Sequence, residues 1–333
     1  MTEPVRPSSG TSLLDPTNPE ELMTVAAWLY YHDGLTQEQV ARELGISRVR
    51  VTRLLQRARR EGIVQIRITR PLPLQYRLER ALRRAFGLKD AIVVRTRHTR
   101  EDTLNALGQA GADYLQRIVF PGCRLGLGWS TTVSRMAPYL TPPPALVPFT
   151  VHELAGSMVG QTNPYSISWR VAEVFRVPLE PLPVPILVES AAAREAVLRE
   201  TQVRRALEHA RQCDIAFVGV GSTREENTLT RLGLLTPDQM RLLREQGAVG
   251  DILMRYFDGE GRHVPLPWDD RIIALEWEDI LRIPHRVIMA AGKHKVPALL
   301  GALRGGLGHT LITDTETARA LLAAGGFSEE PPP

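Results

Sequence analysis

Arginine, threonine and valine side chains lie close together in one short segment, and their chemistry suits the reading of DNA bases. Planar guanidinium groups such as those of Arg48 and Arg53 can donate two parallel hydrogen bonds to a guanine edge or to a phosphate. The methyl groups of Val49 and Thr52 suit the methyl group of thymine. The residues expected to contact DNA are Ser47, Arg48, Val49, Thr52, Arg53, Gln56 and Arg57.

Two helices joined by a tight turn are expected to position these side chains. Thr36 and Ser47 are suited to begin the two helices as N-caps, and Gly45 can adopt the positive φ that the turn between them needs. Apolar residues at helical spacing would face inward. The segment 35–56 therefore predicts a helix-turn-helix, whose core a preceding apolar helix at 22–31 would complete.

An ordinary helical hairpin with a solvated basic face is the alternative interpretation. From Arg42 to Arg70, however, nine arginines stand against two acidic residues, Glu43 and Glu61. A solvated helix usually carries both signs, so this one-sided charge favours contact with phosphates. The alternating sequence at 63–68 further predicts a strand, which could form a wing of the domain.

Polar residues also gather where predicted strands end, in the rest of the chain. GLGWSTT (126–132) combines small residues with three hydroxyls ahead of a predicted helix, which suits a phosphate, although a tight structural turn is the alternative. A second junction, FVGVGS (217–222), is a strand that ends in glycines. Two further junctions supply Asp251 and Lys295, although Asp251 could instead cap a loop. Together these junctions indicate a small, polar, anionic ligand. The residues expected to bind it are Gly128, Ser130, Thr131, Thr132, Gly221, Asp251 and Lys295.

Strand-like apolar runs alternate with helical periods after residue 90, which predicts an α/β domain with a largely parallel sheet covered by helices on both faces. A Pro-rich hinge and an amphipathic helix over residues 71–89 are expected to link this domain to the helix-turn-helix. The expected strands cover residues 91–94, 125–129, 149–154, 215–220, 272–276, 287–291 and 310–313. The expected helices cover residues 104–119, 133–137, 193–211, 238–246, 297–303 and 316–323.

The chain of 333 residues has a formal net charge of only +4, so its basic character is local to the helix-turn-helix. No run approaches the ~18 apolar residues of a membrane span, and the N-terminus lacks a secretory signal pattern, so a cytoplasmic protein is expected. Cys123 and Cys213 lie in apolar segments without a ligand cluster, which favours reduced core residues over a disulfide or a metal site. Disordered tails are expected at 1–19 and 328–333, and no cofactor is expected.

Taken in order, several segments closely resemble the SorC/DeoR-type sugar-binding transcriptional regulators of bacteria. The similarity runs from residue 22 to residue 323 and includes LTQEQVARELGISRVRVTRLLQ, GLKDAIVV, GLGWSTT, CDIAFVGVGS, GAVGDILMRYFD and LITDTETARALL. The resemblance implies a winged-helix-like DNA-binding domain at 20–70 and an α/β effector domain at 90–327, related in fold to sugar-phosphate isomerases. It also implies a homo-oligomer, dimer or tetramer, that a phosphorylated sugar releases or rearranges on operator DNA, as in a repressor.

By position, the resemblance assigns the phosphate loop and the other ligand contacts to Gly128, Ser130, Thr131, Thr132, Asp251 and Lys295. Ser130 and Ala291 depart from the pattern, because the family usually has glycine at both places. Some members carry a basic residue where this chain has Ala155 and Gly156, so an imine-forming lysine is excluded there. The alternative function is an enzyme, a sugar-phosphate isomerase or kinase with an appended DNA-binding head, for which Asp251 is the evident base.

Overall fold

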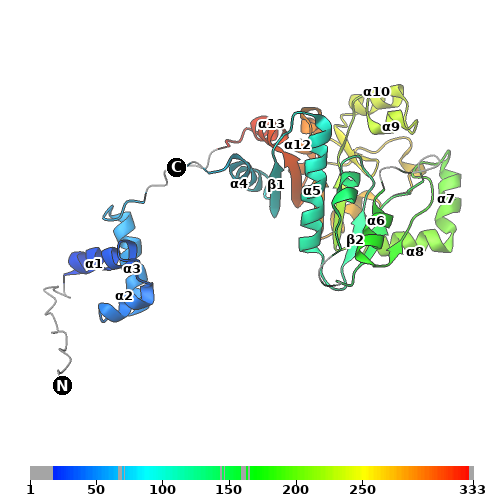
Figure 1. Ribbon diagram of the computed structural model, residues 1–333. Coiled ribbons are helices and arrows are strands. Elements are labelled where there is room, and N and C mark those ends of the chain that lie inside the picture. Colours follow the sequence, from blue (N-terminus) through cyan, green and yellow to red (C-terminus); the bar gives the residue numbers. More distant parts are fainter. Residues whose placement is uncertain are drawn as a thin grey trace, which may run out of the picture. The chain divides into compact units, whose positions relative to one another are not determined.

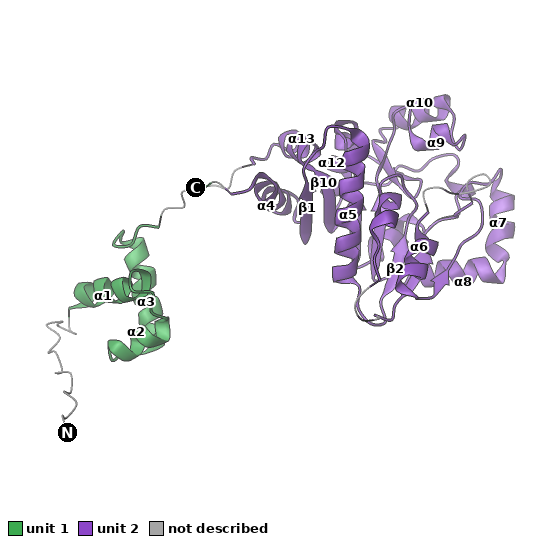
Figure 2. Ribbon diagram, in the orientation of Figure 1, with its two compact units in different colours: residues 1–71 green, residues 72–333 purple. Residues whose placement is uncertain are grey.

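The computed structural model describes residues 18–66, 70, 72–142, 145, 147–158, 163 and 166–329. The chain forms two compact units, divided between residues 71 and 72 and coloured separately in Figure 2. The predicted tails lie largely outside the described residues. At their inner ends, however, Asn18 caps the first helix and Glu329 pairs with Arg319 at 3.1 Å, so these positions are structured.

The described part of unit 1 consists of three helices, α1 (Pro19–Tyr31), α2 (Gln37–Glu43) and α3 (Arg48–Arg60) (Figure 1). Thr36 caps α2 through reciprocal hydrogen bonds with Gln39, and Ser47 caps α3. Gly45 makes the turn between them at φ +64°, in the left-handed region that suits glycine. The predicted helix-turn-helix is therefore confirmed, including its caps and its turn. Its core is formed by Met23, Ala26, Ala27, Val40, Ala41, Val51, Leu55 and Ala58.

The strand predicted after α3 is not formed in the part of it that the structure describes. Residues 63–66 have no strand partner, and residues 67–69 lie outside the described residues. The chain instead folds back over the end of α3, where the Val64 N–H donates to the Ala58 carbonyl at 3.1 Å. The alternation in this segment therefore reflects one residue that turns inward, Val64, while Ile63 and Ile66 stay exposed.

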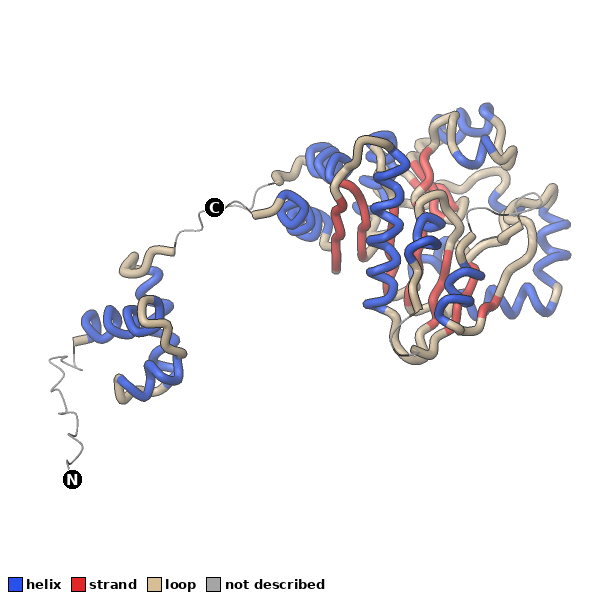
Figure 3. The backbone as a smooth tube through the Cα atoms, viewed as in Figure 1, coloured by secondary structure: helices blue, strands red, loops and turns tan. Residues whose placement is uncertain are grey.

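Unit 2 is built on a seven-stranded sheet with the order β1-β10-β9-β5-β2-β3-β4, in which every neighbouring pair is parallel (Figures 1 and 3). In the central strand β5, Phe217 packs into the core on one face and Val218 into the core on the other. Burial on both faces explains why β5 is an apolar run. The predicted parallel α/β domain is confirmed. Its strands are β1 (Asp90–Val94), β2 (Arg124–Leu127), β3 (Thr150–Glu153), β4 (Leu179–Glu180), β5 (Ile215–Gly219), β9 (His285–Met289) and β10 (Thr310–Asp314).

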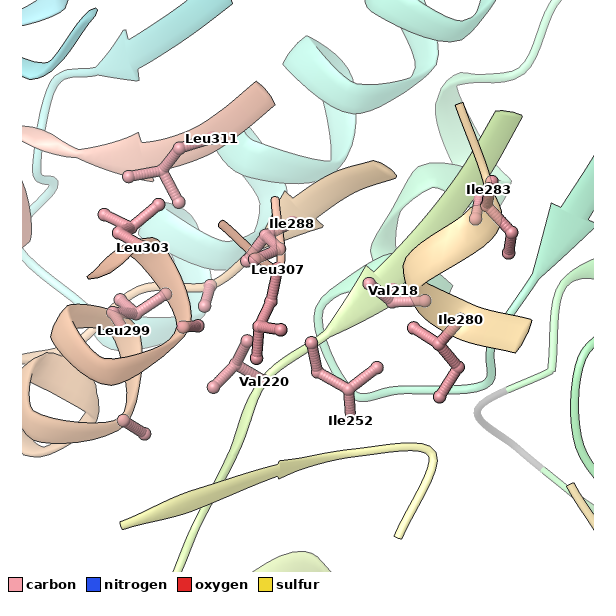
Figure 4. Close-up of a cluster of buried hydrophobic side chains, with 14 of the residues drawn as sticks. Val218, Val220, Ile252, Ile280, Ile283, Ile288, Leu299, Leu303, Leu307 and Leu311 are labelled. Atoms are coloured by element: carbon pink, nitrogen blue, oxygen red, sulfur yellow. The ribbon is translucent and has the colours of Figure 1, made fainter. Parts of the chain in front are cut away.

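Helices cover both faces of this sheet, as the sequence predicts. Figure 4 shows one of the two cores, in which Val218, Ile288 and Leu311 of the strands meet Leu299 and Leu303 of α12. The helices on this face are α4 (Leu74–Phe86), α8 (Thr201–Ala210), α11 (Trp277–Arg282), α12 (Val296–Arg304) and α13 (Thr315–Gly325). The helices on the opposite face are α5 (Arg100–Ile118), α6 (Ser168–Phe175) and the 3-10 helix η1 (Val133–Tyr139).

A small antiparallel sheet, which the sequence did not predict, begins directly after β5. Its strands are β6 (Gly221–Ser222), β7 (Gly250–Ile252) and β8 (Arg255–Phe257). Leu253 and Met254 form the turn between β7 and β8 with φ of 55° and 63°. Such a turn normally favours glycine or asparagine, so Leu-Met gave no turn signal.

The strand predicted over residues 272–276 is wrong as a member of the main sheet. Ile272 and Ala274 instead make isolated bridges to Leu187 and Ala155, respectively. This run is apolar because it crosses a third buried cluster, which lies against the small sheet rather than within the large one. A short apolar run indicates burial but does not by itself identify a sheet strand.

Two helix predictions also need correction. The helix predicted over 193–211 is broken at Glu200, whose ψ of 126° is extended, so that α7 (Ala191–Arg199) and α8 are separate helices. The helix predicted at 133–137 is the 3-10 helix η1, which contains Pro138. The remaining short elements are α9 (Thr228–Arg231), α10 (Pro237–Glu245), η2 (Asp269–Arg271) and η3 (Lys293–Lys295).

The helix predicted as a linker, α4, is an integral part of unit 2. Leu78 and Leu82 are fully buried in the core of unit 2, and the Glu79 carboxylate accepts a hydrogen bond from the Val93 N–H of β1 at 3.0 Å. The predicted free thiols, Cys123 and Cys213, are buried, and burial raises the pKa of each. Within the described residues, no helix is both long enough and apolar enough to cross a membrane.

Candidate functional site

A cavity opens at the carboxyl ends of β2 and β5, where the chain leaves the parallel sheet. The loop at 129–132 follows β2, the β6–β7 ladder follows β5, and η3 follows β9. Of the seven residues predicted for a ligand site, six line this cavity, and Gly128 does not. The described residues that line it are Trp129, Ser130, Thr131, Thr132, Ile186, Gly219, Val220, Gly221, Thr228, Leu229, Asp251, Leu253, Met254 and Lys295.

Ser130 organises the loop rather than offering a free acceptor. Its Oγ accepts hydrogen bonds from the N–H groups of Thr132, at 3.2 Å, and Val133, at 2.9 Å. The start of η1 is therefore already capped by a side chain, and these two N–H groups are not free for a ligand. Ser130 packs closely against the backbone of Gly219. A Cβ atom on Gly219 would lie only 2.5 Å from the Ser130 Cβ, so there is no room for a side chain between them.

Thr131 and Thr132 supply the hydroxyls that remain available in this loop. Neither side chain has a hydrogen-bond partner among the residues that the structure describes, and both line the cavity. Gly128 does not line the cavity but makes room for the Leu253 side chain. A Cβ atom at position 128 would lie 2.7 Å from Leu253 Cδ2. Of the backbone N–H groups of the predicted cradle, those of Thr132 and Val133 are therefore occupied by Ser130, and the Thr131 and Thr132 hydroxyls stand beside this capped turn.

Asp251 lies in the wall of the cavity and is only 9% exposed. Its Oδ2 accepts a hydrogen bond from the Met254 N–H at 3.1 Å, across the left-handed turn. Burial raises the pKa of Asp251 to about 6, while the Lys295 ammonium and the Met254 N–H act in the opposite direction. Asp251 is therefore a buried carboxyl group with an oxygen left to receive a donor from a ligand.

Lys295 lies beside Asp251 at the cavity, at the end of η3. Its Nζ donates to the Val220 carbonyl at 2.6 Å, which ties it to the chain that leaves β5. Burial lowers the pKa of Lys295, and the Asp251 carboxylate raises it. Lys293, by contrast, is 73% exposed and pairs with Glu316 at 3.4 Å, as expected for a solvated neighbour. The ammonium of Lys295 is thus the cation that the described cavity lining offers to an anion.

Several lining residues were missed by sequence reasoning. Trp129 stands within the recognised loop but was not singled out, and its indole N–H donates to the Gly156 carbonyl at 3.1 Å. Leu253 and Met254 have left-handed backbone without being glycine, a conformation that is costly for such side chains and is concentrated at functional sites. Thr228 and Leu229 come from α9, a helix too short to give a periodic signal.

The outer surface of α3 presents the side chains predicted to contact DNA. Arg48, Val49, Arg53 and Gln56 are exposed, and Val49 is 62% exposed although it is apolar. Thr52 differs from them, because it is partly buried and its hydroxyl donates to Gln37 Oε1 at 2.9 Å and to the Arg48 carbonyl at 3.0 Å. Its hydroxyl therefore holds α3 against α2, and only its methyl group remains for a base.

Two of the arginines in the C-terminal half of α3 already have partners. Arg57 pairs with Glu61 at 2.6 Å, and Arg59 donates to the Tyr31 hydroxyl at 2.6 Å. Arg48 and Arg53 have no ion pair or side-chain hydrogen bond among the described residues. Their guanidinium groups, like those of the exposed Arg50 and Arg60 on the same helix, are therefore available to a nucleic acid.

Comparison with known proteins identifies both units. Residues 71–323 match the Sugar-bind family, a sugar-binding domain, and residues 23–70 match the MarR family. The chain is 33% identical over 306 residues to the deoxyribonucleoside regulator of Bacillus subtilis (strain 168), covering 91% of this chain and 97% of that protein.

Solved structures give the same result. The full-length sorbitol operon regulator SorC from Klebsiella pneumoniae has a TM-score of 0.70 at 27% identity, covering 91% of this chain and 98% of that chain. A DeoR family transcriptional regulator from Listeria monocytogenes has a TM-score of 0.70 at 27% identity, covering 75% of this chain and 100% of that chain. The chain belongs to the SorC/DeoR-type family of sugar-binding transcriptional regulators.

Proposed function

We propose that this protein controls carbohydrate-metabolism genes by binding operator DNA through α3 and a phosphorylated sugar in the cavity of unit 2. The observation that carries the effector part is the gathering of Thr131, Asp251 and Lys295, which are distant in the sequence, around one cavity. Hydroxyl donors, an ammonium and a buried carboxylate match a ligand that is anionic at one end and rich in hydroxyls elsewhere.

Each group has a role in this proposal. The Thr131 and Thr132 hydroxyls and the Lys295 ammonium donate to the phosphate, and the Asp251 carboxylate accepts from sugar hydroxyls. Ser130, Gly128 and Gly221 act indirectly, because they shape the loop or make room for neighbouring side chains. Among the relatives, one is named a deoxyribonucleoside regulator and another a sorbitol operon regulator. Both names refer to compounds that are sugars or contain one, in keeping with a phosphorylated sugar as the effector of this chain.

In DNA binding, Arg48, Val49, Arg53 and Gln56 read base edges, with the Thr52 methyl group beside them. Ser47, at the start of α3, and Arg57 hold phosphates. One recognition helix covers only a few base pairs, so the active form is a homo-oligomer, a dimer or a tetramer, that places two or more copies on the operator. It acts in the cytoplasm.

Effector control requires that the sugar bind the DNA-bound and free forms with different affinities, because equal affinity shifts no equilibrium. The protein performs no chemistry on its ligand. Among the described residues that line the cavity, Asp251 is the sole carboxyl group, and Lys295 beside it is held on the Val220 carbonyl.

A two-part experiment tests this proposal. An operator is selected from random DNA with the full chain, and Arg53→Ala is then titrated against it in a gel-shift assay. Loss of a bidentate guanine contact costs ~1–3 kcal/mol and relaxes the preference at one base pair. Arg199→Ala, an exposed arginine of unit 2, is the matched control. Unchanged affinity and unchanged sequence preference for Arg53→Ala would refute the assignment of α3.

The second part is a thermal-shift screen of phosphorylated sugars. A ligand at a hundred times its dissociation constant stabilises the folded protein by about 2.7 kcal/mol. The shift should shrink in Asp251→Asn and in Thr131→Val, and the same sugar should change operator affinity. A sugar phosphate that binds tightly and leaves operator affinity unchanged would overturn the proposed control. Turnover of a sugar phosphate that Asp251→Asn abolishes would show an enzyme instead.

A further inference from the structure

The ligand cavity does not end at Thr131 and Lys295, because it continues into a wider opening. Thr131, Thr228 and Lys295 line both spaces, so the inner cavity and the outer opening meet at these three residues. The other described residues of the outer opening are Arg100, Ser222, Arg224, Glu225, Glu226, Asn227, Arg231, Arg244 and His294. Four arginines and one lysine thus surround an opening that holds two glutamates.

The charges of this opening are only partly compensated. Arg244 pairs with Glu225 at 2.8 Å and also donates to the Thr223 carbonyl at 2.7 Å. Arg231 donates to the Thr228 hydroxyl at 3.4 Å. Arg100 and Arg224 have neither an ion pair nor a side-chain hydrogen bond to any residue that the structure describes. Two exposed guanidinium groups therefore face the opening without a counter-charge, and Glu226 is the remaining acid beside them.

These unpaired cations lie close to one another. Burial is the largest cause that lowers the pKa of His294. The positive charges of Lys295, Arg100 and Arg224 each lower this pKa further, so all three cations lie near the His294 imidazole. Arg100 also lowers the pKa of Lys295. They come from the start of α5, the loop after β6 and η3, which are separate in the sequence. Like charges assembled in this way repel one another, and a bound anion relieves that repulsion.

We infer that the outer opening binds a second anionic group of the same effector, so that the effector class is a sugar with two anionic groups, as in a sugar bisphosphate. This inference rests on the proposed effector site. One anionic group lies at Thr131 and Lys295, the sugar hydroxyls reach Asp251, and the second anionic group extends outward to Arg100 and Arg224. Guanidinium forks suit a phosphate because they can donate to two of its oxygens at once.

The test compares singly and doubly phosphorylated forms of the same sugars by isothermal titration of the full chain. The probes are fructose 6-phosphate with fructose 1,6-bisphosphate, and ribose 5-phosphate with ribose 1,5-bisphosphate. For at least one pair, the bisphosphate should bind tenfold or more tightly than its monophosphate, and its affinity should fall more steeply with salt. Equal affinity within both pairs would overturn the inference.

Variants separate the two parts of the site. The double variant Arg100→Gln, Arg224→Gln should weaken the bisphosphate tenfold or more and leave the monophosphate unchanged. Both side chains are exposed and unpaired among the described residues, so the unliganded variant should melt at the wild-type temperature or slightly above it. Arg199→Gln is the matched control. Thr131→Val should weaken both ligands alike. An equal loss of both ligands in the double variant would contradict a separate outer group.

The outcomes also separate this inference from the proposed function. If a monophosphate binds and changes operator affinity while the bisphosphate gains nothing, the proposed function stands and the second anionic group is refuted. If no singly or doubly phosphorylated sugar of the thermal-shift screen binds, while DNA binding is intact, both the phosphorylated-sugar effector and its second group are refuted.

Discussion

The Oδ1 atom of Asp251 lies 1.7 Å from the point that a Cβ atom would occupy on Gly221. The two residues face each other across the β6–β7 ladder, where they are register partners. No side chain can therefore stand at position 221 while the Asp251 carboxyl keeps its place in the cavity wall. The glycine is required by the carboxyl group, and not by its own backbone angles, which lie outside the left-handed region.

Gly221→Ala should displace the Asp251 side chain and thereby weaken the binding of a phosphorylated sugar tenfold or more. The overcrowding should also cost about 1–3 kcal/mol of stability. Gly259→Ala is the control, because a Cβ there meets nothing within 4 Å. Titration calorimetry and urea unfolding measure the two effects. Wild-type binding by Gly221→Ala would mean that Asp251 does not contact the ligand.

The stability of the unliganded protein should depend on pH through Asp251. Burial raises the pKa of this carboxyl group from 3.8 to about 6, so the folded chain holds a proton that the unfolded chain has lost in this interval. Its contribution is fully present below pH 3.8 and is lost as the pH rises through about 6. The shift of about two units corresponds to roughly 3 kcal/mol.

Asparagine in Asp251→Asn cannot titrate. From pH 4 to pH 7 the unfolding free energy of the wild type should therefore decrease relative to that of the variant. Urea unfolding at a series of pH values measures this difference. Asp238→Asn, at an exposed position of α10, should show no comparable trend. A constant difference for Asp251→Asn would contradict a buried, protonated carboxyl group.

Gly45→Ala should destabilise unit 1 by about 1 kcal/mol, because alanine is strained in the left-handed region that this turn requires. A Cβ at this position meets nothing within 4 Å, so the cost is conformational and not steric. Gly45→Asn should recover most of the loss, since asparagine tolerates this conformation better. Differential scanning calorimetry of the full chain measures both variants. An asparagine variant less stable than the alanine variant would contradict this explanation.

Thr52→Val should lower the stability of unit 1 by about 1 kcal/mol while leaving the preferred operator sequence unchanged. The substitution keeps the shape and a methyl group but removes the hydrogen bonds from Thr52 to Gln37 Oε1 and to the Arg48 carbonyl. Selection of operators from random DNA by wild type and variant measures the sequence preference. A changed preference at one base pair would show that the hydroxyl reads a base after all.

Glu61→Gln should strengthen DNA binding several-fold and steepen its salt dependence. Glu61 pairs with Arg57 at 2.6 Å, so its removal frees a guanidinium for a phosphate and also removes a negative charge near the DNA. Glu208→Gln breaks a similar Arg–Glu pair four residues apart in unit 2 and serves as the control. Gel-shift titrations at several salt concentrations measure the effect. Equal salt slopes for Glu61→Gln and wild type would place Arg57 away from the phosphates.

The parts of the fold that the sequence predicts are those governed by local chemistry. Thr36, Gly45 and Ser47 each act within a few residues of their own position, so the caps and turn of the helix-turn-helix were recognisable. Strands such as β5 were recognisable because burial on both faces gives a continuous apolar run, whereas β4, with only Leu179 and Glu180, gave no such run and was not predicted. An apolar run at 272–276 led to the wrong prediction of a strand of the main sheet. Residues buried against the small sheet show the same apolar pattern as residues buried within the large sheet.

The cavity was predictable in its polar residues and not in its apolar ones. Asp251 and Lys295 stood out as charges beside glycines at the ends of strands. Leu253 and Met254 did not, because their left-handed backbone is imposed by the ladder around them, including the Met254 N–H bond to Asp251. The role of Ser130 was also hidden, since a hydroxyl that caps its own turn has the same sequence signature as one that waits for a ligand.

Trp129 gives the cavity its own optical reporter. Its indole lines the space in which Thr131 and Lys295 lie, and its N–H is fixed on the Gly156 carbonyl. Tryptophan emission responds to the polarity and charge around the ring, so arrival of an anionic sugar beside it changes the intrinsic fluorescence of the unlabelled protein. Of the other four tryptophans, Trp28 and Trp169 are exposed and Trp268 and Trp277 are buried, so the substitution Trp129→Phe identifies the part of the signal that comes from the cavity. Occupancy of the cavity can therefore be followed in real time while the same sample binds operator DNA.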